Sequence, residues 1–167
     1  MNLTRSALAT KTAALAGYPQ CYADSKEFDV TRNVPVEHEA AFVKAFIVRA
    51  KQERYLELLS KPKRRQAVLR SLAHFSDLDP QIQVPIPPSE QAPSRLEQLL
   101  RSRGAPSECY LISEDAALDG RTIALSEALT LIVGRGMGTL LSCIPGHLGY
   151  YEGEDRGARW LLERGAA

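Results

Sequence analysis

TLLSCIPGHLGYY, residues 139–151, is the stretch that decides the fold class. Two strand-like runs, residues 139–144 and 147–151, flank Pro145-Gly146, a dipeptide typical of tight turns. The pattern predicts a β-hairpin. Because side chains alternate across a strand, the second run should present two sets of residues to opposite faces: Leu148, Tyr150 and Glu152 to one, and His147, Gly149 and Tyr151 to the other.

The rest of the C-terminal half is expected to supply one more strand and three helices. The strand is predicted at residues 109–113. Helical spacing of apolar residues predicts a helix over 93–103 and a short buried helix over 124–133. A closing helix is expected around Trp160, Leu161 and Leu162. With the hairpin, these elements predict an α+β fold with a small three- to four-stranded, mainly antiparallel sheet and flanking helices.

The N-terminal half is predicted to contain a helical hairpin that packs with this sheet. A first helix is expected over 37–59, because Val34-Pro35 disfavours helix at the preceding residues. Ser60 and Pro62 resemble an N-cap followed by a first-turn proline. They predict a second helix over 60–75.

These elements give a domain organisation. Residues 1–35 are expected to form a loosely ordered arm, and residues 36–167 a single α+β domain. The domain is divided into a basic helical hairpin (36–76), a proline-rich connector (77–93) and an α/β portion (94–167). Five prolines between residues 79 and 93 exclude a central strand or a helix interior there.

Cysteine usage and hydropathy predict a cytoplasmic protein. The 167 residues include three cysteines, Cys21, Cys109 and Cys143, without a C-x-x-C motif, which favours free thiols in a reducing compartment. No apolar run approaches the roughly 20 residues that span a bilayer, so no membrane contact is expected. The acid-poor start of the chain leaves a targeting segment open as an alternative.

The net charge of +1 conceals a strong asymmetry. Residues 1–75 carry 13 Lys and Arg against 7 Asp and Glu, whereas residues 76–167 carry 8 Arg against 13 Asp and Glu. Such a distribution indicates a surface for an anionic partner. Alternatively, the cationic and acidic halves attract each other within one molecule, or attract the opposite halves of a neighbouring subunit in a homo-oligomer.

A group of cations surrounds the start of the second predicted helix: Lys61, Lys63, Arg64, Arg65 and Arg70. Cations at this end oppose the helix dipole, and a residue choice that breaks a local rule suggests a function. We therefore hypothesise a non-catalytic binding or regulatory protein, whose basic helix engages an acidic protein partner or nucleic acid. The alternative interpretation is a solvated charged face.

A second hypothesis is a small hydrolase or nuclease with a site at the hairpin. Cys143, His147 and Glu152 supply a thiol, an imidazole and a carboxylate, the parts of a nucleophilic site. Two other motifs have weaker support. Gly134–Gly138 (GRGMG) lies between a predicted helix and a strand, the wrong context for a phosphate-binding loop. The residues around His74 match no standard metal spacing, so we expect neither a metal nor a cofactor.

Overall fold

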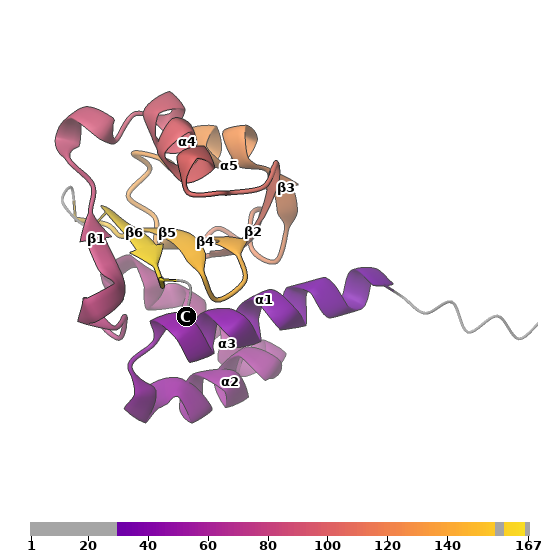
Figure 1. Cartoon of the computed structure of the whole chain (residues 1–167). Helices are drawn as coiled ribbons and strands as arrows, with labels where there is room; N and C mark the ends of the chain where they lie inside the picture. Colours follow the sequence, from indigo (N-terminus) through magenta and orange to yellow (C-terminus); the bar gives the residue numbers. More distant parts are fainter. Residues whose placement is uncertain (1–29, 156–158, 166–167) are drawn as a thin grey trace, which may run out of the picture.

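In the computed structural model, which describes residues 30–155 and 159–165, a six-stranded sheet lies between two layers of helices (Figure 1). Its order is β1-β6-β5-β4-β2-β3, and every neighbouring pair is antiparallel. The strands are β1 (Gln83–Pro85), β2 (Glu108–Ser113), β3 (Thr122–Ala124), β4 (Thr139–Ile144), β5 (Leu148–Glu152) and β6 (Arg159–Glu163).

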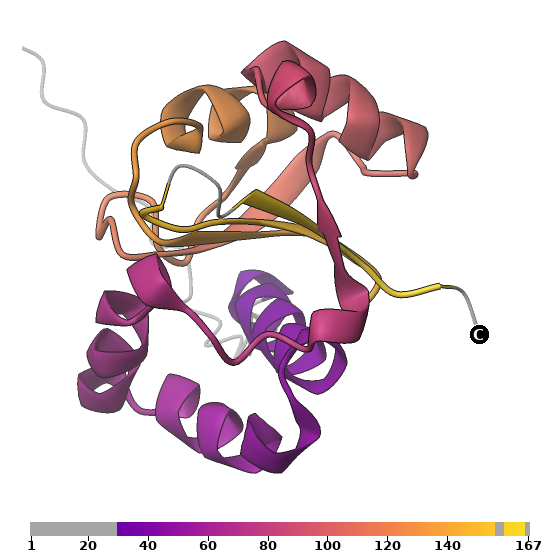
Figure 2. The same ribbon diagram turned by 90° about the vertical axis from the view of Figure 1, so that its left-hand side faces the viewer.

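The helices are divided between the two faces of the sheet, as the view along its edge shows (Figure 2). One face, here called the α1 side, is covered by α1 (Val30–Phe46), α2 (Gln52–Ser60) and α3 (Pro62–Arg70). The other, the α4 side, is covered by α4 (Pro93–Ser102) and α5 (Leu125–Ile132). Short 3₁₀ turns complete the connections: η1 (Arg49–Lys51), η2 (Leu72–His74), η3 (Pro80–Ile82) and η4 (Pro88–Glu90). Among the described residues, no helix combines the length and apolar character needed to cross a bilayer.

Alternation along the strands builds one hydrophobic core on each side of the sheet. Ile112 and Tyr151 belong to the core on the α1 side, whereas their chain neighbours Leu111 and Tyr150 belong to the core on the α4 side. β4 and β5 form the predicted hairpin, with Thr139 paired to Glu152. The predicted α+β class and the hairpin are therefore confirmed.

The prediction of three or four strands was wrong, because three of the six strands were missed. β6 occupies the position of the predicted closing helix. Its Leu161 is buried in the core on the α4 side and Leu162 in the core on the α1 side, so consecutive apolar residues here reflect burial on both faces of a strand rather than a helical stripe. β1 and β3 are edge strands of three residues each, and β1 ends at Pro85, a residue tolerated at an edge.

The first helix also differs from its predicted bounds of 37–59. α1 begins at Val30 and continues through Pro35, and residues 1–29 of the predicted arm lie outside the described residues. A proline disfavours helix before it but does not forbid it. α1 then ends at Phe46, because Ile47 forms a β-bridge with Leu78 and the Val48 N–H donates to the Asp77 carbonyl at 3.0 Å.

Gly138 holds the connection from α5 to β4 against the η2 turn. A Cβ at this position would lie 2.1 Å from the backbone N of Ala73 and 2.1 Å from the backbone C of Leu72. Only glycine fits such an approach without moving the backbone. The glycine-rich segment 134–138 therefore has a packing role here.

We expect Gly138→Ala to lower the free energy of unfolding by about 2 kcal/mol or more, because the added methyl collides with backbone rather than with a movable side chain. Gly165→Ala is the matched control, since a Cβ there meets nothing within 4 Å. Urea unfolding followed by circular dichroism measures both. Equal stabilities of the two variants would contradict the close approach.

Candidate functional site

The five predicted binding cations are distributed around α3 and do not form one surface. Val68 and Leu69 are buried, and Arg65 lies three and four residues before them, on the same side of the helix. Arg65 therefore points inward. The other four cations are exposed: Lys61, Lys63, Arg64 and Arg70.

Arg65 joins α3 to α1 and to the loop that follows β2. Its Nη1 donates to Glu39 Oε1 at 2.6 Å, while Nε and Nη2 donate to the two carboxylate oxygens of Asp119 at 2.9 and 2.8 Å. All three side chains are largely buried, with exposed fractions of 16%, 14% and 13%. Burial alone would lower the pKa of Arg65, but hydrogen bonds and charges from Asp119 and Glu39 outweigh it and raise the pKa. Arg65 is thus an internal clamp.

Two further polar contacts lie near the Arg65 ion pairs, between α1 and the strands of the sheet. The Tyr110 hydroxyl donates to Glu39 Oε1 at 2.5 Å, and His38 Nδ1 shares a hydrogen bond of 2.8 Å with Ser142 Oγ. Burial lowers the pKa of His38, outweighing the opposite effect of the Glu37 charge, so the imidazole is neutral near pH 7. Because Ser142 is only 1% exposed, this serine–histidine contact links α1 to β4 rather than presenting a nucleophile to a substrate.

The outward cations of α3 have different surroundings. Lys61 Nζ and Arg64 Nη1 both bond to Glu57 Oε1, at 2.6 and 2.7 Å. The hydrogen bond from Lys61, followed by the charges of Lys61 and Arg64, lowers the pKa of Glu57. Two cations therefore share one carboxylate. Lys63 and Arg70 form no ion pair with any residue that the structure describes.

Two further exposed cations that were not predicted, Arg49 and Arg54, lie in the same layer of helices. They lie on η1 and α2, next to α3 in the same helical layer. The sequence predicted one helix over 37–59, but the chain turns between α1 and α2. The positions of these two cations were therefore not predictable from the helical pattern.

Part of the charge asymmetry of the sequence is balanced within the molecule. Among the described residues, two ion pairs join the cationic first half of the chain to the acidic second half: Arg65 with Asp119 and Lys51 with Asp77. The Lys51 Nζ–Asp77 Oδ1 distance is 2.5 Å, and the Tyr55 hydroxyl donates to Asp77 Oδ2 at 2.7 Å. Attraction between the two halves, one of the interpretations of the asymmetry, therefore operates at these two contacts.

The structure does not bring the three residues of the catalytic alternative together. Cys143 is buried on the α4 side, and burial raises the pKa of its thiol. Glu152 lies at the other end of the hairpin, because it pairs with Thr139 whereas the turn end of β4 pairs with Leu148. His147 is exposed in the turn. These positions do not form a nucleophile, base and orienting group in mutual contact.

Glu152 has a different role, because its carboxylate binds the glycine-rich segment from inside. It accepts hydrogen bonds from the Gly134 N–H at 2.7 Å, the Tyr150 hydroxyl at 2.7 Å and Arg159 Nη2 at 3.2 Å. The Gly134 N–H is therefore already hydrogen-bonded to a carboxylate of the protein itself. Within the described residues, no group of three or more His, Cys, Asp or Glu side chains could hold a metal ion.

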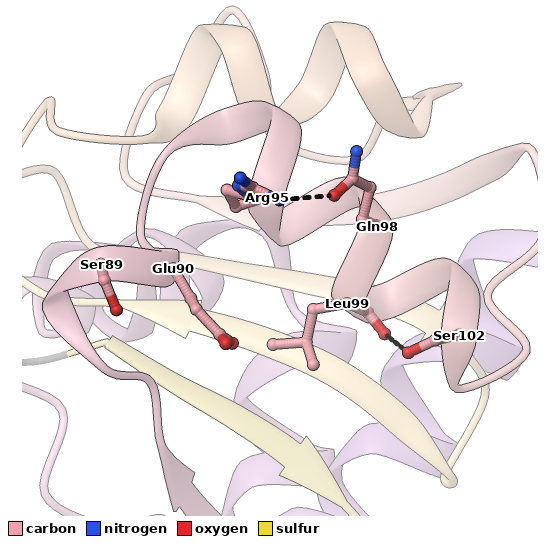
Figure 3. Close-up of a pocket in the computed structure, with 6 residues that line it drawn as sticks. All are labelled: Ser89, Glu90, Arg95, Gln98, Leu99 and Ser102. Carbon is pink, nitrogen blue, oxygen red and sulfur yellow. Dashed lines mark hydrogen bonds between the residues drawn. The ribbon is translucent and has the colours of Figure 1, made fainter.

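A hollow of about 450 Å³ lies beside α4, on the side of the sheet away from α3 (Figure 3). Its lining is polar except for Leu99: Ser89, Glu90, Arg95, Gln98, Leu99 and Ser102. Arg95 Nη1 donates to Gln98 Oε1 at 3.4 Å, and the Ser102 hydroxyl donates to the Leu99 carbonyl at 2.7 Å. Neither lining serine contacts a base, so the hollow lacks an activated nucleophile among its described residues.

Comparison with known proteins gave no match that would indicate a family or a function. The sequence matches no protein-family model, and no curated protein or solved structure is significantly similar to it.

We expect Arg65→Ala to lower the free energy of unfolding by about 2–3 kcal/mol, because it leaves the carboxylates of Glu39 and Asp119 without their buried partner. Arg64→Ala, on the exposed side of the same helix, should change it by less than about 1 kcal/mol. Arg65→Lys should be intermediate, since lysine cannot make the bidentate contact. Denaturant unfolding of the three variants measures the differences, and equal losses for Arg64 and Arg65 would contradict the clamp.

Asp77 should give the protein an acid-sensitive contribution to stability. Burial alone would raise its pKa, but hydrogen bonds from Lys51 and Tyr55 lower it below the usual 3.8. A lowered folded-state pKa stabilises the fold above about pH 4, and the contribution is lost as the pH falls through the folded value. We therefore expect the stability difference between the parent and Asp77→Asn to be largest near pH 7 and to shrink below about pH 4.

Unfolding titrations at several pH values measure this difference. Asp155→Asn, which changes an exposed aspartate, is the matched control and should leave the stability difference small throughout. A constant difference for Asp77→Asn between pH 7 and acid would refute the assignment.

Proposed function

We propose that the protein is a non-catalytic cytoplasmic binding protein that engages an acidic protein partner. The surface that would bind the partner is the solvent-facing side of α2 and α3, which carries the exposed cations Lys61, Lys63, Arg64 and Arg70. The observation that carries the proposal is the exposed face of α3. Lys63 and Arg70 lie seven positions apart and hence two turns, about 10 Å, along one side of the helix. Neither forms an ion pair with a described residue, so both charges are available to a partner.

Neighbouring cations strengthen the positive potential of this surface. Lys61 and Arg64 are each more than half exposed and share the single carboxylate of Glu57, which leaves an excess positive charge. Arg49 and Arg54 lie in the adjacent part of the same layer. Concentrated charge of one sign attracts and orients a partner of the opposite sign.

The amount of charge favours an acidic protein over nucleic acid. Between residues 49 and 70, seven exposed cations, one of which (Lys51) is paired with Asp77, are interspersed with the exposed carboxylates of Glu53 and Glu57: Arg49, Lys51, Arg54, Lys61, Lys63, Arg64 and Arg70. Tight binding to nucleic acid commonly uses about 6–10 phosphate contacts, more than this surface offers after its own carboxylates are counted. An acidic peptide segment needs only a few complementary charges.

The buried thiols are compatible with the proposed compartment. Cys109 and Cys143 are both free in the structure. Free cysteines are common in reducing compartments, which supports the cytoplasmic part of the proposal.

The proposal is tested with the double variant Lys63→Glu/Arg70→Glu. We expect it to weaken binding of a fluorescent Glu-rich peptide by about tenfold at low salt, because reversal of two exposed charges removes two attractive contacts and adds repulsion. The matched control, Arg95→Glu/Arg135→Glu, changes the net charge equally but on residues outside the α1–α3 layer. Fluorescence anisotropy over a salt series measures both variants.

Three outcomes would overturn the proposal. The parent protein binds no Glu-rich peptide, the two double variants lose binding equally, or the parent binds an oligonucleotide more tightly than the peptide. The last result would assign the surface to nucleic acid instead.

A further inference from the structure

Two cysteines lie opposite each other on the central strands of the sheet. β2 and β4 pair Leu111 with Leu141 and Tyr110 with Ser142, so the same register continued by one residue sets Cys109 opposite Cys143. Both cysteines belong to the core on the α4 side, which also contains Leu111 and Leu141. Their side chains therefore leave the sheet on the same face.

The spacing of opposed strand residues suits a disulfide. Directly opposed residues of antiparallel strands have Cα atoms about 4.5–5.5 Å apart, and disulfides bridge Cα atoms about 4.4–6.8 Å apart. The Cβ atoms of such a pair must approach slightly to reach the spacing of a disulfide. The register between β4 and β5 shifts between Ser142 and Ile144, which makes Cys143 the extra residue of a β-bulge. A bulge interrupts the ladder and gives the local backbone room for this adjustment.

A hollow of about 350 Å³ lies at the end of the sheet, and both cysteines are among the residues that line it. Its lining combines the two cysteines with Glu108 on β2, His38 on α1 and Pro145 in the turn after β4. Neither thiol is committed to a strong interaction. Cys109 Sγ contacts the Ile123 carbonyl at 3.6 Å, and both cysteines are free. Because the two cysteines are only 2% and 3% exposed, a small oxidant such as hydrogen peroxide suits this site better than a protein-sized one.

We propose that Cys109 and Cys143 form an oxidation site that closes to a disulfide between β2 and β4 when the protein meets hydrogen peroxide. The thiolate of one cysteine attacks one peroxide oxygen, the O–O bond breaks, and hydroxide leaves, which gives a sulfenic acid on that cysteine. The thiolate of the other cysteine then attacks this sulfur and forms the S–S bond as a second hydroxide leaves. The two thiol protons and the two hydroxides make two water molecules, so the sulfurs are oxidised and the peroxide is reduced.

Burial sets the speed of these steps. Burial, with a further contribution from the Glu108 charge, raises the pKa of Cys109 to about 12. Burial and the neighbouring Cys109 also raise the pKa of Cys143. Because the thiolate is the attacking species, closure is slow compared with oxidation of an exposed thiol.

The experiment uses the full chain carrying Cys21→Ser, so that only the two sheet cysteines remain. The folded protein is incubated with hydrogen peroxide, quenched with catalase, unfolded, alkylated with iodoacetamide and measured by intact mass and by a non-reducing peptide map. We expect a mass loss of two hydrogen atoms, no alkylation of either cysteine and a peptide pair linked through Cys109 and Cys143. Dithiothreitol should restore two alkylated cysteines.

Matched controls separate closure from independent oxidation. Cys109→Ser and Cys143→Ser, each in the same background, keep one thiol and should give only alkylated or oxygen-added monomer. The proposal is overturned if the two-cysteine protein, treated while folded, ends with both cysteines alkylated, with oxygen added but no linked pair, or with disulfides only between molecules. It is equally overturned if the linked pair forms only when peroxide is added in urea.

Discussion

The structure depends on a sheet whose central strands are buried on both faces. Every residue of β5 is buried, and so are all but the first residue of β2 and all but the last of β4. Such strands are stable only when apolar layers cover both sides. The requirement accounts for the two separate cores and for the division of helices, with α1–α3 on one side and α4–α5 on the other. It also explains why polar groups inside the layers, such as Glu152 and Arg65, are fully engaged by internal partners.

Charge acts in two ways in this molecule. Some cations of the helical layer are bound internally, and the Arg65 contact with Glu39 and Asp119 fixes α3 against α1 and the sheet. Others, such as Lys63 and Arg70, face solvent on the opposite side of the same helix. The short helix α3 therefore carries a buried cation on one side and exposed cations on the other. The direction of each side chain determines whether it stabilises the fold or can contact a partner.

Strong local patterns were predictable from the sequence, and long-range pairings were not. The Thr139–Tyr151 hairpin is confirmed because its turn dipeptide and alternation are local. β6 was mistaken for a helix because its apolar residues Trp160, Leu161 and Leu162 are consecutive and show no alternation, and because β1, one of the two strands that pair with them, lies far away in the sequence. β1 and β3 are too short to show any period. The break between α1 and α2 depends on contacts with residues 77 and 78.

Long-range contacts also limited what the sequence could predict about Arg65 in the candidate site. Arg65 carried one usable signal, its position three and four residues before Val68 and Leu69, which places it on the apolar stripe of α3. A cation on such a stripe requires a buried counter-charge. The identity of that counter-charge was hidden, because Glu39 and Asp119 are 26 and 54 residues away.

The strand order also constrains how the chain assembles. Among the described strands, β1 comes first in the sequence, yet it pairs only with β6, which comes last. During synthesis, therefore, β1 emerges early and remains unpaired until the last strand has left the ribosome. Meanwhile β2, β3, β4 and β5 can already form their ladders. The insertion of β6 between β5 and β1 is then the step that completes the sheet, and we expect this long-range closure to be slower than formation of the local ladders.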